Sequence, residues 1–446
     1  MPKVLVAKKN GGTTQLNNIT LPSELKGFIN TNTEEGTTAA DRKIYLIRGK
    51  LDTSEQICPI CGSRMHVHNT YDTLLSHLPF GGSLSAVGFP KHRYHCPKCK
   101  ATRMEQVDFQ AQGHRITIPL QNFTEDLLHS GLTLKMVSSL TGLGKNVVKE
   151  IDKKRLAALY CKDGGGEWRR PLETPSVIGI DEFKLHDGHK YATVILSMET
   201  GHVLYLAKGK KKHVVYDFID FVGEEWMDNV EAVCCDMNSD FQEAFEDKCP
   251  HIQCVFDYFH IKKNLNDKVV SEVRKDEQRR LRDEGKEEEA AMLKKTRFIL
   301  TSSRRTLARK DAEKGTSSLD RYESIIRENK LLFTADIVKE KLTYAYMLTD
   351  ECEMASEIID IIDMCNSTCN KNFIWFANLL ENHFEGIIAH ATYRFSSGKV
   401  EGTNNMIKTI RRQGYGYPDD DYFFLKIFDA SRRTYVRNPK SHKIQD

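Results

Sequence analysis

Hydrophobic and polar residues alternate with different periods in successive parts of this 446-residue chain. Between residues 174 and 260, short apolar runs rich in β-branched residues alternate with segments whose apolar residues recur at helical spacing. In chain order these segments predict β-β-β-α-β-α-β. From 261 to about 390 the pattern is helical and highly charged with no clear strand. Residues 391–446 contain one amphipathic helix and an aromatic tail.

The length and charge narrow the class of protein only slightly. The length predicts about three domains. The net charge of +3, from 65 basic and 62 acidic residues, is too even to indicate nucleic-acid binding by itself. Basic clusters at 208–213 and 407–413 are candidates, although each is equally typical of a solvated face. The longest apolar runs are far shorter than the roughly 20 residues of a membrane span, and no secretory leader opens the chain. We therefore expect no membrane partner, and a bacterial cytoplasm or a nucleus would suit the sequence.

Two Cys-x-x-Cys pairs predict a structural zinc site. "CPIC" at 58–61 and "CPKC" at 96–99 each place two thiolates on a tight turn, and four thiolates complete the tetrahedral shell of one Zn²⁺. The residues between the pairs, including "LPFGGSLSAVGF", can form a hairpin. The alternatives are two coincidental turns or a redox pair, but a redox pair is expected singly beside a βαβ unit. The predicted zinc ligands are Cys58, Cys61, Cys96 and Cys99.

Residues 133–156 predict a helix-turn-helix. Two short apolar stripes at helical spacing are separated by "TGLG", whose glycines break the helix. The second helix would present amide and basic side chains, which are the groups that contact DNA phosphates and bases. An ordinary helical hairpin is the alternative. The predicted DNA contacts on this helix are Lys145, Asn146, Lys149 and Lys153.

Two predicted strands end in carboxylates. "VIGIDEFK" leads into Asp181, and "VEAVCCDM" leads into Asp236. The predicted order of elements is that of a ribonuclease-H-like fold, in which the first and fourth strands are neighbours, so the two aspartates are expected side by side. Adjacent carboxylates repel unless a cation lies between them. Hard oxygen ligands favour Mg²⁺ or Mn²⁺.

A third carboxylate, Glu401, begins the amphipathic helix "GKVEGTNNMIKTIRR". It could complete a site for two Mg²⁺ or Mn²⁺ ions about 4 Å apart. Asp257 and His260, after a further strand, are expected to brace the site, whereas Glu182 is expected on the opposite side of its strand. A single Asp at a strand end is usually a turn or cap residue, so the combination and its order carry the prediction. Polar residues of the helix that would line a DNA-phosphate groove are Asn405, Lys408, Arg411 and Arg412.

Five stretches together resemble the DDE transposases of the bacterial insertion-sequence family ISL-three: "CPIC…CPKC", "IGIDEFK", "CCDM", "FDYFHIKKNL" and "VEGTNNMIKTIRRQGYGYPDDDYF". They extend from about residue 55 to 430, and the last is long and specific. The resemblance implies that Asp181, Asp236 and Glu401 are the catalytic residues. "DYFH" is similar to a DxxH motif of relatives with a helical insertion before the final catalytic helix. The resemblance also implies binding of terminal inverted repeats by the zinc and helix-turn-helix regions, and self-assembly on DNA as a homodimer or larger, in the bacterial cytoplasm at the nucleoid.

The expected fold is multidomain α/β, with a ribonuclease-H-like catalytic core that contains a helical insertion and follows a zinc-binding module and a helix-turn-helix. The expected function is a transposase that binds terminal inverted repeats and carries out metal-dependent cleavage of double-stranded DNA and strand transfer to a target. A hydrolytic nuclease of the same fold and a zinc-containing DNA-binding regulator derived from a transposase are the alternatives. The predicted segments are 1–45, mobile N-terminal arm; 46–115, zinc-binding domain; 116–165, helix-turn-helix; 172–260, first part of the core; 261–390, helical insertion; and 391–446, final catalytic helix and tail.

Overall fold

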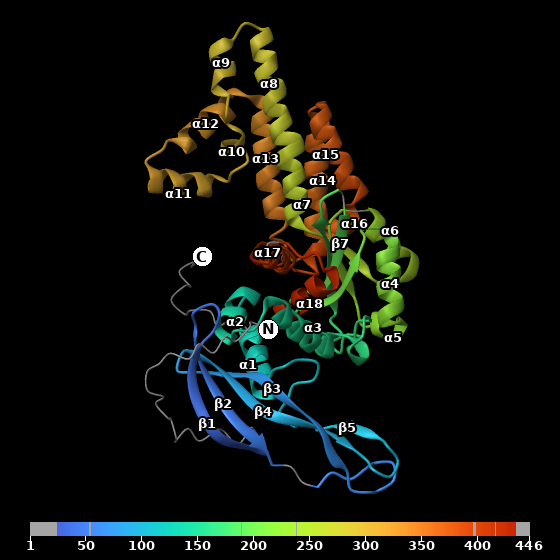
Figure 1. Cartoon of the computed structure of the whole chain (residues 1–446). Coiled ribbons are helices and arrows are strands. Elements are labelled where there is room, and N and C mark those ends of the chain that lie inside the picture. Colours follow the sequence, from blue (N-terminus) through green and yellow to red (C-terminus); the bar gives the residue numbers. More distant parts are fainter. Residues whose placement is uncertain are drawn as a thin grey trace. The chain divides into compact units, whose positions relative to one another are not determined.

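The computed structural model describes residues 25–52, 55–188, 190–237, 239–395, 398–414 and 416–433 (Figure 1). The chain forms two compact units. Unit 1 contains residues 1–167 and 413–425, and unit 2 contains residues 168–412 and 426–446. Residues 1–24 of the predicted arm lie outside the described residues.

Unit 1 begins with a five-stranded sheet of order β1-β2-β4-β3, in which β5 pairs with β4. The hairpin predicted between the cysteine pairs is present as β3 and β4, joined at Gly81 and Gly82, whose positive φ angles of 56° and 79° suit glycine. Residues 28–45, expected in the arm, instead pair as β1 and the start of β2, because Ile44 and Leu46 are buried in the sheet. The strands are β1 (Phe28–Thr37), β2 (Lys43–Leu51), β3 (His66–Phe80), β4 (Ser83–His95) and β5 (Thr102–Met104).

Three helices follow the sheet in unit 1: α1 (Ile118–His129), α2 (Leu134–Thr141) and α3 (Lys145–Tyr160). The Thr133 hydroxyl accepts from the Met136 N–H and caps α2. Gly142 ends α2 in the left-handed conformation, with φ of 73°, so the predicted break between the two helices is confirmed. A short 3₁₀ turn, Lys162–Gly164, closes this part of the chain.

Unit 2 contains a second five-stranded sheet, of order β10-β9-β6-β7-β8. β6, β7 and β8 are antiparallel, whereas β9 is parallel to β6 and β10 is parallel to β9. The predicted order of elements and the predicted pairing of the first and fourth strands of this region are both confirmed. The elements are β6 (Val177–His186), β7 (Lys190–Ser197), β8 (Val203–Lys208), α4 (Lys212–Val222), α5 (Glu224–Met227), β9 (Ala232–Cys235), α6 (Ser239–Lys248) and β10 (Gln253–Phe256).

A long helical insertion follows β10 (Figure 1). Among the described residues of 261–390 it contains helices and no strand, as predicted. Its elements are α7 (Tyr258–Asn264), a π-helical turn (Leu265–Val270), α8 (Ser271–Asp283), α9 (Glu287–Met292), α10 (Arg297–Leu300), α11 (Arg304–Lys314), α12 (Ser318–Glu328), α13 (Lys330–Ala345), α14 (Glu351–Ser367), α15 (Lys371–Asn382), α16 (Phe384–Ile388) and a 3₁₀ turn (Ala389–Ala391).

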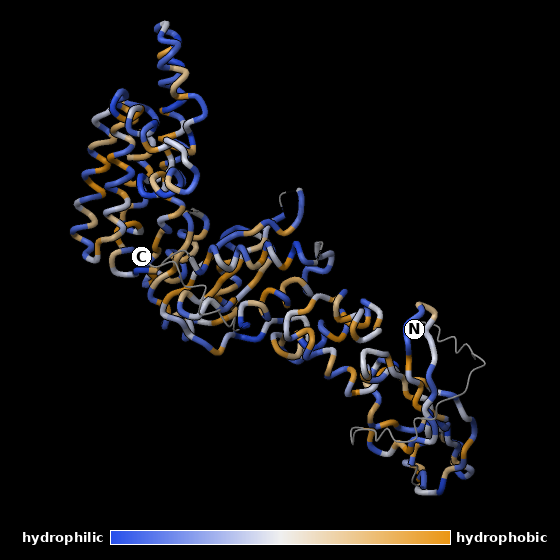
Figure 2. Tube along the Cα trace, turned by 90° about the vertical axis from the view of Figure 1, so that its left-hand side faces the viewer, coloured by the Kyte–Doolittle hydropathy of each residue, from blue (hydrophilic) through white to orange (hydrophobic). Residues whose placement is uncertain are grey.

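One continuous apolar core joins the insertion to the sheet of unit 2. It includes Ile180 of β6, Phe218 of α4, Phe256 of β10 and Phe373 of α15. Hydrophobic and hydrophilic residues alternate along the helices (Figure 2). Within the described residues, no helix has the length and apolar character needed to cross a membrane.

After the insertion the chain returns to the sheet as helix α17 (Gly398–Gln413), followed by α18 (Asp420–Ser431). The Lys399 ammonium donates to the carbonyl of Met198 at 2.7 Å, and the Arg411 guanidinium donates to the carbonyl of Lys184 at 2.8 Å. These contacts attach both ends of α17 to the sheet. Glu401, 165 positions after Asp236, thereby lies on a helix that is held beside β6.

Candidate active site and zinc centre

Three aspartates lie at one level across three neighbouring strands of unit 2. Gly179 of β6 is in register with Cys234 of β9, so Asp181, two residues further on, stands level with Asp236. Cys235 is in register with Phe256 of β10, which brings Asp257 level with Asp236. Residues in register on adjacent parallel strands direct their side chains to the same face of the sheet. The predicted neighbourhood of Asp181 and Asp236 is therefore present, and Asp257 joins it.

Contrary to the prediction, β6 continues past Asp181 to His186. A small cavity lies beside Asp181 and the ends of β9 and β10. The pair of predicted bracing residues, Asp257 and His260, lines it together with the two predicted catalytic aspartates. The His260 Nδ1 atom lies 4.0 Å from a carboxylate oxygen of Asp236. The full lining is Ile180, Asp181, Cys234, Cys235, Asp236, Asp257, His260 and Val400.

The environment of Asp181 disfavours its negative charge. Burial is the largest effect and raises the pKa of this carboxyl above its ordinary value, and the nearby Asp236 charge raises it further. The Glu182 backbone N–H donates to Asp181 at 2.7 Å and opposes the rise, as do His260 and the amide of Asn404. The Cys234 thiol is held neutral, because burial and the charges of Asp257 and Asp181 raise its pKa to about 12. Adjacent buried carboxylates of this kind favour a cation between them.

Helix α17 contributes Asn404 to the site. Its Nδ2 donates to the Asp181 carboxylate, and its Oδ1 is buried without a hydrogen-bond partner among the described residues. Sequence reasoning selected the neighbouring Asn405, which is exposed. The available signal was the spacing of Val400 and Asn404, because residues four apart lie on one face of a helix and Val400 lines the cavity.

Glu401 lies in the first turn of α17 and is exposed. It does not line the cavity with the two aspartates. It nevertheless stands beside Val400 and three residues before Asn404, and side chains three apart are neighbours on a helix surface. Of the other predicted groove residues, Lys408 and Arg412 are exposed. Arg411 is half-buried through its contact with β6.

Asp257 has a structural partner of its own. Its carboxylate accepts from the Phe259 N–H at 3.0 Å and caps α7, the first helix of the insertion. The rings of Tyr346 and His390, both from the insertion, pack together with centroids 4.8 Å apart. The Asp257 charge helps to raise the pKa of the buried Tyr346, although burial is the larger cause. Sequence reasoning missed Tyr346, because no local pattern distinguishes it from a core residue.

The four cysteines of unit 1 converge as predicted, with all their sulfur atoms within 4.8 Å of one another. The two turns are built alike. The N–H of Gly62 donates to the carbonyl of Cys58 at 2.9 Å, and the N–H of Lys100 donates to that of Cys96 at 3.0 Å. Both donors have positive φ, 68° and 63°. This arrangement is compatible with a tetrahedral zinc site.

Hydrogen bonds lower the pKa of two of the four cysteines and so favour their thiolate form. The backbone and hydroxyl of Ser63 lower the pKa of Cys61 to about 6. Backbone N–H groups of Cys61 and Ile60 lower the pKa of Cys58. Since the thiolate is the form that binds a metal, these bonds favour zinc ligation.

The predicted contacts of α3 divide into two pairs. Lys145 and Asn146 are exposed. The ammonium groups of Lys149 and Lys153 instead lie 2.9 and 3.0 Å from a carboxylate oxygen of Asp419, in the segment after α17 that belongs to unit 1. This attachment has a buried component, because the Tyr422 hydroxyl donates to the buried Asp152 carboxylate of α3 at 2.7 Å.

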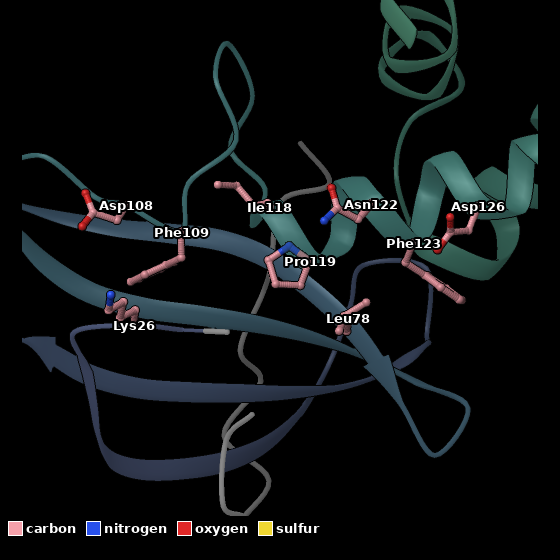
Figure 3. Close-up of a pocket in the computed structure, with 9 residues that line it drawn as sticks. All are labelled: Lys26, Leu78, Asp108, Phe109, Ile118, Pro119, Asn122, Phe123 and Asp126. Atoms are coloured by element: carbon pink, nitrogen blue, oxygen red, sulfur yellow. The ribbon is translucent and has the colours of Figure 1, made fainter. Parts of the chain in front are cut away.

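Unit 1 also contains a cavity of about 480 Å³ between its sheet and α1 (Figure 3). Phe109, Phe123 and Leu78 make much of its wall apolar. Its charged lining is Lys26 against two aspartates, Asp108 and Asp126, which does not favour an anion such as phosphate.

Comparison with known proteins identifies the class of protein. A family described as "Transposase" matches residues 178–427, more than half of the chain and a range that includes both predicted catalytic aspartates and α17. The chain is a transposase by family, and the family to which it belongs is ISL-three (ISL3).

Two insertion-sequence proteins illustrate the relationship. The chain is 27% identical to the transposase for insertion sequence element IS1001 of Bordetella parapertussis over 385 residues, which cover 86% of this chain and 90% of that protein. It is 24% identical over 259 residues to the transposase for insertion sequence element IS1557 of Mycobacterium tuberculosis, covering 54% of this chain and 56% of that protein. Because the first relationship covers 86% of this chain, it extends beyond residues 178–427, which the family matches.

Proposed function

We propose that unit 2 carries a ribonuclease-H-like catalytic core that cleaves DNA at the ends of an insertion sequence and joins the freed ends to target DNA. The observation that carries this proposal is the register of Asp181 with Asp236 on adjacent parallel strands. The strand order β10-β9-β6-β7-β8, with three antiparallel strands and two parallel ones, supports the same core.

The residues of the cavity fit divalent cations. Asp181 is buried beside Asp236, and both the burial and the like charge raise its pKa. The Asn404 Oδ1 atom, buried and without a hydrogen-bond partner in the described part of the chain, is a further oxygen ligand. Carboxylate and amide oxygens are the donors that Mg²⁺ and Mn²⁺ prefer. Asp181, Asp236 and Glu401 would hold the ions, with Glu401 brought in from the exposed face of α17.

Each residue of the site has a role in this proposal. Bound divalent ions would activate the attacking oxygen and stabilise the leaving oxygen of an in-line displacement. Asn404 orients the Asp181 carboxylate, and His260 lies beside Asp236. The freed 3′-OH of the element end attacks a target phosphodiester in the second step.

Lys408, Arg411 and Arg412, along α17, would bind the phosphate backbone. In unit 1, Lys145 and Asn146 of α3 would contact the terminal repeats.

Replacement of Asp181 by Asn tests the catalytic part. The end-specific cleavage rate should fall roughly a thousandfold, because several kcal/mol of charge stabilisation come from the ions and each 1.36 kcal/mol is tenfold. End binding, measured by gel shift, should be retained. Glu182→Gln is the matched control, a carboxylate next in sequence that is not assigned to the site, and it should cleave at nearly the wild-type rate.

Strand transfer separates a transposase from a nuclease of the same fold. Pre-cut element ends, incubated with the wild-type protein, Mg²⁺ and plasmid target, should yield joined products. Cleavage without any joined product would favour the hydrolytic nuclease. End binding without metal-dependent nicking would favour the DNA-binding regulator.

A further inference from the structure

Residues 294–310 of the insertion concentrate positive charge. These 17 residues include seven Lys or Arg and no Asp or Glu, so their formal charge is +7. The whole chain carries +3, which leaves 3 − 7 = −4 for all other residues. The stretch contains α10, the start of α11 and the turns on either side of α10.

Most of these cations face solvent. Arg304 is half-buried, and the other six are exposed. Arg297 pairs with Asp267 at 2.8 Å, and Arg309 approaches Glu313 at 3.9 Å. Within the described residues, no carboxylate lies within ion-pair distance of the remaining four: Lys294, Lys295, Arg305 and Lys310.

Some other basic residues of the insertion are paired along their own helix or with the next one. Lys275 lies 2.6 Å from Glu272 on α8, and Lys341 of α13 lies 2.7 Å from Glu357 of α14. Charge runs of that kind solvate a helix face. Residues 294–310 differ in the density of positive charge, because seven basic residues lie within 17 positions that contain no acidic residue.

Neighbouring helices hold residues 294–310 in place through hydrogen bonds and ion pairs. The ammonium of the buried Lys339, on α13, donates to the carbonyls of Leu300 and Ser302 at 3.3 and 3.1 Å. Arg304 is held by Asp336 at 2.5 Å and by Glu323 at 2.8 Å. A backbone that is already held in place loses less conformational entropy when its side chains bind a partner.

An exposed aromatic ring lies among the cations. Phe298 is 79% exposed, and the guanidinium carbon of Arg297 lies 5.9 Å from its ring centroid. Lys295 has φ of 61°, a conformation that residues other than glycine adopt infrequently. An exposed ring beside cations can pack against the sugars of a DNA backbone while the cations contact the phosphates.

We infer that this insertion surface, defined as Lys294, Lys295, Arg297, Phe298, Arg305 and Lys310, binds the phosphate backbone of duplex DNA. The inference rests on the proposed function, since it supplies a DNA contact in addition to α3 and α17. The partner is chosen by charge: unpaired cations with fixed backbones are complementary to the phosphate array of a duplex. Recognition is independent of sequence, because phosphates carry no base information.

Neutralising the four unpaired cations tests the inference. The full-length protein with Lys294→Gln, Lys295→Gln, Arg305→Gln and Lys310→Gln should bind a random-sequence DNA duplex at least tenfold more weakly at physiological salt. The slope of log affinity against log salt should become shallower by roughly 0.9 for each lost phosphate contact. Phe298→Ala alone should weaken binding severalfold and leave the salt slope unchanged, because the ring carries no charge.

The matched control removes the same charge elsewhere in unit 2. It replaces four exposed basic residues outside the insertion and outside the basic cluster at 208–213 by Gln: Arg169, Arg170, Lys190 and Lys248. This control should lose much less affinity than the insertion variant. Equal losses in both would attribute the effect to net charge and overturn the assignment. Circular dichroism and the unfolding midpoint verify that both variants fold.

Two other outcomes would also overturn the inference. Unchanged affinity and salt slope in a folded insertion variant would exclude DNA from this surface. A lower oligomeric mass by light scattering, with DNA affinity intact, would assign the surface to a second copy of the chain. At saturating protein the insertion variant should still cleave element ends with Mg²⁺. Absence of wild-type cleavage would therefore contradict the proposed function without deciding this surface.

Discussion

The two predicted metal sites of this protein are built in opposite ways. The four cysteines of unit 1 come from two short turns of the same construction, and their sulfur atoms already lie within 4.8 Å of one another. The carboxylates of unit 2 come from strands and a helix far apart in sequence. Asp181 and Asp236 are brought together by strand register, whereas Glu401 remains exposed on α17. All four predicted ligands of the first site already lie together, whereas the predicted third carboxylate of the second site stands apart from the two aspartates.

This difference corresponds to the distinction between structural and catalytic metal sites. A structural ion has all its ligands from the protein and contributes to folding directly, whereas a catalytic ion keeps open positions. Loss of a cysteine ligand should therefore unfold unit 1. Loss of a carboxylate ligand should instead reduce the activity of unit 2. Three experiments sharpen or break this comparison.

The largest effect is expected at the closed site. Cys96→Ser should abolish zinc binding and unfold the sheet of unit 1, because structural zinc supplies roughly 10 kcal/mol or more in small domains. Elemental mass spectrometry measures the zinc content. Limited proteolysis measures the protease resistance of residues 25–110. Cys352→Ser, at an exposed cysteine outside the cluster, is the control and should retain zinc. Full zinc content in the Cys96 variant would contradict the assignment.

A smaller effect is expected at the helix that faces the open site. Asn404→Ala should slow cleavage about 10- to 100-fold, which is the usual cost of removing a group that orients a metal ligand. The Asn404 amide lowers the pKa of Asp181, so its loss should move the acidic limb of the pH–rate profile to higher pH.

Asn405→Ala provides the control for this position. Asn405 is the neighbouring amide and is exposed, so its loss should change neither the rate at saturating DNA nor the pH profile. A rate loss at Asn404 without any shift of the pH profile would show that the residue supports α17 and does not act on Asp181.

The smallest effect is a change in stability. Without metal, Asp181 has a folded-state pKa above its ordinary value. Its contribution to stability is thus complete at low pH and is lost as pH rises through the folded-state pKa. Asp181→Asn should raise the unfolding temperature in a chelator at neutral pH, and this gain should vanish near pH 3, where both forms are uncharged. A stability loss at neutral pH would show that the aspartate is structural, as the cysteines are.

Strong local patterns account for what could be predicted from the sequence. The strand order of unit 2 followed from apolar runs, the break at Gly142 from a glycine, and the cysteine cluster from its spacing. The β1–β2 hairpin was missed because β1 is rich in Thr, Asn and Glu and is largely exposed. Asn404 was missed for a different reason. The rotation of α17 against β6 is set by tertiary packing, and an error of one position exchanges Asn404 for Asn405.

The predicted DNA contacts of α3 compete with ion pairs inside unit 1. Only residues 414–418 separate the end of α17 from Asp419, which holds Lys149 and Lys153 of α3. Phosphate and the Asp419 carboxylate compete for the same two ammonium groups. A duplex that engaged both lysines would have to displace the Asp419 carboxylate, and the segment before α18 would then lose its ion pairs with α3.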